Sequence, residues 1–483
     1  MNVSAKQNVY PNIYRIYFFA NCFFSIITFF VSFIVDKGIG YELMPIIPLV
    51  YFVCFALGKD IHYYSVRYPG VLILNVLMFL KYVVTIFFTS INHNYELARY
   101  YQINVIETSY RMATIIILIE LCSVFATISF AAHRIYEKSD QNKSNIIIRY
   151  QKINFGPILL LALGCGGLTI IHNRKEYIAR SMIIFSDNTA LSEKIEINNS
   201  LSLIFHTLNI VIIGLLINYF IVMYDKSRQK KYIIWSYIAI TALVFLSIST
   251  SRMNIVIPFV LFILITSKRF GKTGTVLNAV AFVGLLIVFA IVSMYKNPWR
   301  YVEGSTISGI LLEFARGMQE YTSGILPTAV GLQAISSYGN SITIFTFFND
   351  FLGAVPGIAG FINQEDRLNY YYNLYPLGGS STSQIIPMSI SSCAYFSWIF
   401  SFILVDICII LLFWVESRTY NKEDRYSNFI HEYQSLYLCF ILASSINSNL
   451  QIVSGRFFVN YLPPMLILYF NGLITIKNNK KAS

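Results

Sequence analysis

Arginine side chains mark three segments of this chain that lie far apart in the sequence. Arg252 lies in STSRMN and Arg456 in VSGRFFVNYLPP, each at the edge of an apolar run, and Arg316 lies in the long segment between them. A guanidinium suits a diphosphate because its planar fork donates two parallel hydrogen bonds to phosphate oxygens and stays charged at any working pH. If these segments open on one side of a membrane, the three arginines build an anion site. The alternative is that each long side chain reaches toward the interface by itself.

The region around Arg316 supplies the other candidate site residues. Glu313 lies three residues before Arg316, so the two share a helix face, either as part of the site or as a structural pair. The candidates for substrate binding are Lys296, Arg300, Arg367, Gly378 and Ser380. The region contains no histidine to act as a general base, so the base is left unassigned and the acids of the region are the groups available for it. These acids are Glu303, Glu313, Glu320, Asp350, Glu365 and Asp366.

Long apolar runs must position these residues, and the composition indicates that a bilayer surrounds the runs. Hydrophobic residues make up 56% of the 483 residues and charged residues only 12%, far below the charged share of soluble domains. The runs predict an all-α polytopic membrane protein of about twelve transmembrane helices. They lie near residues 16–35, 41–58, 69–90, 110–132, 153–172, 201–224, 232–250, 254–267, 275–295, 386–414, 433–447 and 457–475. The runs at 254–267 and 433–447 are short enough to be half-helices packed against protein.

Charge and cysteine placement narrow the class further. The short basic segments DKSRQKK, KRFGK and KNNKK fall on one side of the predicted membrane, so both termini are expected in the cytoplasm. The net charge of +12 is spread over such loops, which argues against nucleic-acid binding. All seven cysteines lie in apolar runs without metal-ligand spacing, so we expect no metal site, no cofactor and no disulfide. A single integral membrane domain over residues 1–483 is expected.

A large outer loop over residues 296–385 is the distinctive feature of this topology. Its segment STISGILLEFARGMQEY predicts an amphipathic helix on the membrane surface, with Glu313, Arg316 and Glu320 on the polar face. The predicted apolar face consists of Ile307, Ile310, Leu311, Phe314 and Met318. Proline and glycine interrupt the following apolar stretches, which predicts short surface or re-entrant helices.

Two opposite charges are expected inside the membrane. Lys81 lies near the middle of one predicted span and Glu120 near the middle of the next, so antiparallel neighbours would bring them to similar depth. We expect them to form an ion pair. The alternative is a proton or ion relay through Lys81, Glu120 and Asp406, which would favour transport.

With these arginines and the large late loop, the C-terminal half resembles the Wzy-type polymerases of O-antigen and capsular polysaccharide. The resemblance rests on STSRMNIVIPFVLFILI, on the loop and on VSGRFFVNYLPPMLILYF, in that order. Arg252, Arg316 and Arg456 match arginines of the family pattern. Arg367 and Gly378 match an arginine followed after ten residues by a glycine. The first half of the chain matches only in hydropathy.

This resemblance implies a GT-C-like fold and a metal-independent glycosyl transfer at the outer face of a bacterial inner membrane. The substrates implied are oligosaccharide repeat units linked to undecaprenyl diphosphate, and a flippase and a chain-length regulator are implied partners. Two rival functions stay open. One is a flippase for the same lipid-linked oligosaccharide, and the other is an O-antigen ligase, although the related ligases are thought to use a histidine that this loop lacks.

Overall fold

The computed structural model describes the chain as helical, with one short pair of strands. It describes residues 11–93, 105–136, 147–149, 199–246, 253–267, 269–270, 274, 276–281, 283–284, 307–355, 357–377, 385–420, 424–426 and 429–470. The chain divides into two compact units. Unit 1 comprises residues 1–143, 303–421 and 438–456, and unit 2 comprises residues 144–302, 422–437 and 457–483. The single membrane domain expected from the sequence stays a prediction.

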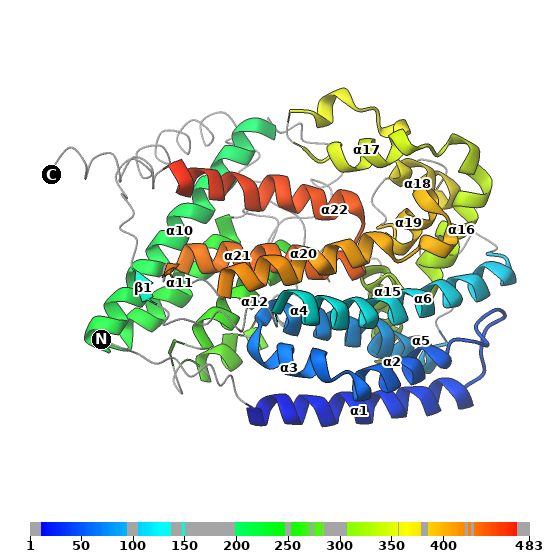
Figure 1. Ribbon diagram of the computed structural model, residues 1–483, viewed down its shortest axis with the longest axis horizontal. Coiled ribbons are helices and arrows are strands. Elements are labelled where there is room, and N and C mark those ends of the chain that lie inside the picture. The colour runs from blue at the N-terminus through cyan, green and yellow to red at the C-terminus, as the bar shows by residue number, and fades with distance from the viewer. Residues whose placement is uncertain are drawn as a thin grey trace. The chain divides into compact units, whose positions relative to one another are not determined.

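Unit 1 holds the N-terminal helices and the helices of the large loop (Figure 1). The N-terminal elements are α1 (Pro11–Ile34), α2 (Ile46–Leu57), α3 (Lys59–Arg67), α4 (Pro69–Phe79), the π-helix η1 (Leu80–Val84), α5 (Thr85–Ile91), α6 (Glu107–Ala131) and the π-helix η2 (Ala132–Tyr136). The later elements are α15 (Ile307–Thr322), α16 (Ile325–Tyr338), η5 (Gly339–Ser341), α17 (Ile344–Leu352), η6 (Ala359–Phe361), η7 (Gln364–Asp366), α18 (Leu368–Leu377), α19 (Met388–Phe396), η8 (Trp398–Phe400), α20 (Ile403–Tyr420), η9 (Ser444–Asn447) and α22 (Leu450–Gly455).

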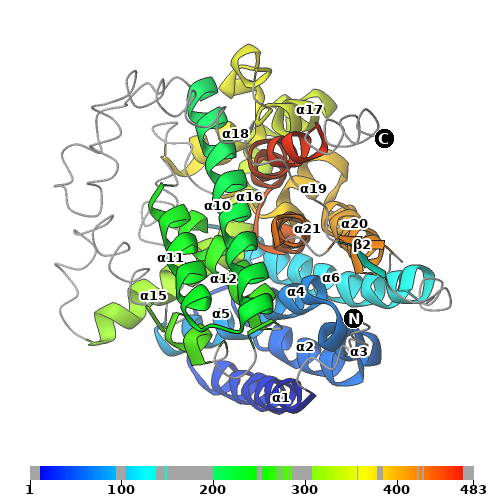
Figure 2. The same ribbon diagram turned by 90° about the vertical axis from the view of Figure 1, so that its left-hand side faces the viewer.

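Unit 2 contains a set of adjacent apolar helices and the two strands. Its helices α10 (Asn199–Ser227), α11 (Lys231–Leu246) and α12 (Met253–Ser267), drawn in green, run beside one another in Figures 1 and 2. The three-residue strands β1 (Ile147–Arg149) and β2 (Asp424–Tyr426) pair in parallel. The helix α21 (Phe429–Ala443) begins in this unit and ends in unit 1, and the π-helix η10 (Arg456–Tyr461) begins at the unit boundary.

Five helices of the described part are long and apolar enough to cross a bilayer. They are Tyr14–Ile34, Pro69–Ile91, Glu107–Ile135, Thr207–Ser227 and Trp398–Thr419. A sixth candidate combines α2 and α3, which meet at an angle of 72°. These helices agree with a membrane protein. The predicted spans at 153–172 and most of 275–295 lie outside the described residues, so the count of twelve stays a prediction.

Local sequence explains where the first helices end. Gly58 separates α2 from α3, and its ψ of 74° turns the chain out of the helical conformation. Tyr68 precedes a proline and is extended, with φ −122° and ψ 118°, because the proline ring disfavours a helical residue before it. Pro69 then opens α4, where its missing N–H costs no hydrogen bond.

The predicted run at 386–414 is not one continuous helix. The structure breaks it into α19, η8 and α20, and the break lies at Ser397, whose φ is +129° and ψ 158°. A residue with a Cβ rarely adopts this conformation, which costs on the order of 1–3 kcal/mol. The membrane-crossing part therefore starts at Trp398, and the strained residue sits immediately before it.

Replacing Ser397 by glycine should therefore stabilise the protein. Glycine adopts this φ without a steric penalty, so we expect Ser397→Gly to raise the free energy of unfolding by about 1 kcal/mol. The measurement is the melting temperature of the purified protein in detergent. As a control, Ser401→Gly replaces a serine whose own φ is −55° and should lower the melting temperature. An unchanged or lower value for Ser397→Gly would contradict the strain.

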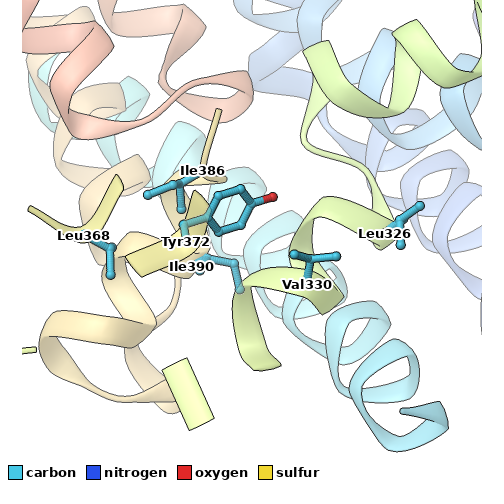
Figure 3. Close-up of a cluster of buried hydrophobic side chains, with 6 residues drawn as sticks. All are labelled: Leu326, Val330, Leu368, Tyr372, Ile386 and Ile390. Carbon is cyan, nitrogen blue, oxygen red and sulfur yellow. The ribbon is translucent and has the colours of Figure 1, made fainter. Parts of the chain in front are cut away.

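The large loop forms a packed layer of short helices, as the sequence predicts. A capping box between Thr343 and Thr346 starts α17. Six buried side chains join α16, α18 and α19 with the segment that precedes α19 (Figure 3), and they are Leu326, Val330, Leu368, Tyr372, Ile386 and Ile390. The ring of Tyr372 lies within this cluster, and its hydroxyl donates to the carbonyl of Pro327 at 3.1 Å. The layer also packs on α6 through α16.

Candidate functional site

The helix α15 confirms the amphipathic helix predicted around Arg316. Small and polar side chains of this helix face the protein, and apolar ones are exposed. Ala315, Gln319 and Thr322 are buried against the protein. The apolar side chains Leu311 and Phe314 are 38% and 48% exposed. A polar or small face toward protein and an apolar face away from it suit a helix whose outer side meets lipid. Arg316 is half-buried and adjoins Ala315 on the inward side.

Hydrogen bonds fix the C-terminal end of α15 on its neighbours in unit 1. The hydroxyls of Thr322 and Thr85 are 2.8 Å apart, which links α15 to α5. The side-chain oxygen of Gln319 accepts from the backbone N–H of Leu326 at 3.3 Å, which links α15 to the start of α16. The helix α15 also packs against η9. The position of Arg316 along the protein surface is thus set by buried contacts one turn further along its helix.

Arg456 lies where α22 passes into the π-helix η10. Asn449 accepts a hydrogen bond from the backbone N–H of Ile452 at 2.7 Å and so caps the start of α22. The guanidinium of Arg456 donates to the hydroxyl of Ser444 in η9 at 3.1 Å. It also lies 5.9 Å from the ring centre of Phe440. These hydroxyl and ring contacts hold the guanidinium against η9 and α21.

The structure thus brings together elements that carry two of the three predicted arginines. Arg316 lies on α15, α15 packs against η9, and η9 holds Arg456 through Ser444. We call these three elements, α15, η9 and the α22–η10 junction, the arginine site. The two cations therefore lie on elements that each pack against η9, and guanidinium groups are the side chains best suited to bind phosphate oxygens. Within the described residues, no group of three or more His, Cys, Asp and Glu side chains is placed to hold a metal ion.

The side chain of Arg367 is bonded to backbone carbonyls of its own loop. Its guanidinium donates to the carbonyls of Ala359 and Ile362, both at 3.3 Å, and so ties the loop after α17 to the start of α18. A Cβ at Gly353 would come within 2.7 Å of the guanidinium and within 2.5 Å of the carbonyl oxygen of Asn349, so a larger residue there would displace the arginine or the backbone. These contacts occupy Arg367 within its own loop. Its role in substrate binding stays a prediction.

The other predicted site residues lie outside the described part of the chain. They are Arg252, Lys296, Arg300, Gly378 and Ser380. The backbone of Glu313 belongs to α15, but its side chain also lies outside what the structure describes. Their roles, including the pairing of Glu313 with Arg316, stay predictions.

Among the acids of the loop, the structure distinguishes Asp350. The sequence offers six acids without ranking them, whereas Asp350 is only 4% exposed. It accepts a hydrogen bond from the hydroxyl of Tyr395, and its other carboxylate oxygen has no hydrogen-bond partner among the described residues. Burial raises the pKa of Asp350 from 3.8 to about 6, although Tyr395, the backbone of Leu368 and Arg367 each oppose the shift. Its helix α17 packs against α22, which leads to Arg456.

The raised pKa gives a testable pH dependence. As pH rises from about 4 toward 6, the unfolded chain loses the Asp350 proton before the folded chain does, so this group lowers the free energy of unfolding. The loss is about 2–3 kcal/mol and is complete above pH 6. Asp350→Asn keeps an acceptor for Tyr395 without the buried charge, so we expect a higher melting temperature than wild type at pH 7 and little difference at pH 4. If the melting temperatures of the two proteins differed by the same amount at every pH between 4 and 7, the raised pKa of Asp350 would be contradicted.

The ion pair expected inside the membrane is confirmed. Lys81 Nζ lies 2.6 Å from Glu120 Oε1, and both side chains are almost completely buried. The hydroxyl of Tyr82 donates to the same carboxylate oxygen at 2.7 Å. Asp406 accepts a hydrogen bond from Ser123, one turn after Glu120 on α6. The three members of the alternative relay thus belong to adjacent helices of unit 1.

Comparisons of this chain with protein-family models, curated proteins and solved structures found no match.

Proposed function

We propose that this protein is a polymerase of lipid-linked glycan repeat units. The observation that supports the proposal most is the packing of α15 against η9, which brings the elements of Arg316 and Arg456 together although the two residues are far apart in the sequence. These are two of the three arginines through which the chain resembles Wzy-type polymerases. The polymerase would join oligosaccharide units carried on undecaprenyl diphosphate into O-antigen or capsular polysaccharide.

The proposed chemistry depends on charge that develops on a leaving group. The hydroxyl oxygen of one repeat unit forms a bond to the anomeric carbon of the growing chain, and the bond from that carbon to the diphosphate oxygen breaks. The electron pair leaves with undecaprenyl diphosphate, and the hydroxyl proton passes to a base. Fixed guanidinium groups stabilise the departing diphosphate because they are oriented before the reaction begins. Arg316 and Arg456, with Arg252, have this role in the proposal.

The membrane setting is part of the same proposal. The five or six candidate spans of the described part support an integral membrane protein. We extend this to about twelve spans in a GT-C-like arrangement, in a bacterial inner membrane with both termini cytoplasmic. The arginine site then opens toward the outer face, where the lipid-linked substrates enter from the bilayer. A flippase that delivers them and a protein that regulates chain length are the expected partners.

A flippase for the same substrate is the second candidate, and the buried charges favour it. Transport through a bundle uses ionisable groups inside the membrane, and Lys81, Glu120 and Asp406 are such groups. The polymerase is preferred because the elements of Arg316 and Arg456 both pack against η9, whereas the buried charges of Lys81 and Glu120 are paired with each other. An O-antigen ligase would use the same arginine chemistry but a different acceptor.

The surface glycan of cells that lack the gene tests these functions against one another. The gel should show single repeat units without a ladder, and the wild-type gene should restore the ladder. Loss of all surface glycan, with lipid-linked units retained on the cytoplasmic side, would indicate the flippase. Polymerised glycan that remains on its lipid carrier would indicate the ligase, and an unchanged ladder would exclude all three.

A further inference from the structure

A buried lysine contacts the backbone of the same short helix that holds Arg456. Lys81 lies in the π-helix η1, in the middle of a candidate span, and is 3% exposed. Besides its ion pair with Glu120, Lys81 Nζ donates to the carbonyl oxygen of Ile446 at 2.8 Å. Ile446 belongs to η9, where the helix α21 gives way to a tighter turn. Lys81 therefore holds η9 from within the membrane-spanning helices.

The other side of η9 holds the guanidinium of the arginine site. Ser444, two residues before Ile446, accepts the hydrogen bond from Arg456. Ser444 itself is buried, and the adjacent carbonyl of Ser444 accepts from the hydroxyl of Ser448 at 2.6 Å. Within the four residues of η9, Ile446 therefore accepts a hydrogen bond from Lys81 and Ser444 accepts one from Arg456. A shift of η9 would move the guanidinium with it.

The next turn of the same span fixes the helix of Arg316. Thr85 follows Lys81 by four residues, and its hydroxyl lies 2.8 Å from that of Thr322 at the end of α15. Thr85 is also bonded to the carbonyl of Leu80, which spans the wide π-helical turn. Wide turns of this kind occur often at functional sites because they change the direction of side chains within an otherwise regular helix. One turn of one helix therefore contacts both η9 and α15.

We propose that Lys81, held by Glu120, is a positioning residue of the arginine site. Its hydrogen bond to Ile446 fixes η9 and thereby the Arg456 guanidinium, next to the α15 helix that Thr85 fixes. This inference rests on the proposed polymerase function. It assigns the ion pair a role in catalysis, whereas a pair that serves packing alone would be replaceable by apolar side chains.

A charge-neutral double variant separates positioning from packing. Lys81→Met/Glu120→Met removes both charges at once, so neither is left buried without its partner. The probe is the lipid-linked repeat unit extracted from the deletion strain, and the readout is the rate of polymerisation by purified protein. Positioning predicts a kcat at least tenfold below wild type with a KM changed less than threefold, at a wild-type melting temperature. A wild-type kcat in the folded double variant would overturn the proposal.

A milder variant keeps the test decisive if the double variant does not fold. Ser444→Ala removes the acceptor of the Arg456 hydrogen bond together with the bond that the same hydroxyl donates to the carbonyl of Ile441 in α21 at 2.9 Å, and it should lower kcat severalfold with little change in melting temperature. Ser90→Ala is the matched control, because the hydroxyl of this buried serine bonds to Ile86 within its own helix. Equal kcat values for Ser444→Ala, Ser90→Ala and wild type would contradict the coupling through η9. The proposed function itself fails separately, if purified wild-type protein does not polymerise the extracted units.

Discussion

Cells that carry Arg316→Ala should lose the glycan ladder while the membrane holds a normal amount of the protein. A fixed donor aimed at charge that develops in the transition state contributes roughly 2.7–4 kcal/mol, so its removal should slow polymerisation by about 100- to 1,000-fold. Arg316 is half-buried on the inward side of α15, and the hydrogen bonds of Gln319 and Thr322 to neighbouring elements remain when its side chain is removed. The variant should therefore fold. The measurement is a gel of surface glycan together with an immunoblot of the membrane fraction.

A surface arginine provides the matched control for this result. Arg111 is 48% exposed at its side chain and forms ion pairs with Glu42 at 3.2 Å and Glu107 at 2.5 Å. Exposed pairs of this kind contribute little to stability, so Arg111→Ala should leave a normal ladder. Arg316→Lys keeps the charge without the planar fork and should give an intermediate result. A normal ladder with Arg316→Ala, at a normal protein level, would remove Arg316 from the catalytic site.

Several features were predictable from the sequence because they follow from local periodicity. The limits of α15 agree with the apolar spacing around Arg316, and the short helices of the large loop agree with its prolines and glycines. The ion pair between Lys81 and Glu120 was predictable because both charges lie near the middle of long apolar runs. An isolated charge is costly there, which leaves a buried partner as the simplest arrangement.

Other features depend on contacts that no local pattern specifies. Neither glycine nor proline marks the break at Ser397, so the run at 386–414 looked continuous. The interpretation of α15 gave the polar face to Arg316 but did not show that this side turns toward protein. The placement of Arg367 against two loop carbonyls required the course of the chain after α17. The sequence shows that an arginine is present, but its partners follow from the tertiary structure.

The arginine site was predictable only in part for the same reason. The sequence singled out Arg316 and Arg456, but η9 contains ordinary serines and no pattern that links it to either arginine. Asp350 was one of six acids until its burial set it apart. The useful signal in the sequence is the cost of an ionisable group in apolar surroundings. That signal finds Lys81 and Glu120 in long runs, and it does not find Asp350, whose burial is produced by helices that pack around it.

Removing the charge of Glu120 alone should have the largest effect on stability. Glu120→Leu leaves the ammonium of Lys81 buried with the carbonyl of Ile446 but without its counter-ion. Breaking a buried ion pair from one side costs about 3–5 kcal/mol, because the remaining charge keeps its desolvation penalty. We expect a large fall in the melting temperature and in the amount of protein in the membrane.

The comparison that isolates this cause adds the second substitution. Lys81→Met in the Glu120→Leu background removes the uncompensated ammonium, so most of the lost stability should return. The hydroxyl of Tyr82 loses its acceptor in both variants and therefore contributes equally to each. If Glu120→Leu alone melts at the wild-type temperature, the ion pair contributes nothing to the stability of the folded protein. In that event the pair would not constrain η9, and Lys81 could not be the residue that positions Arg456.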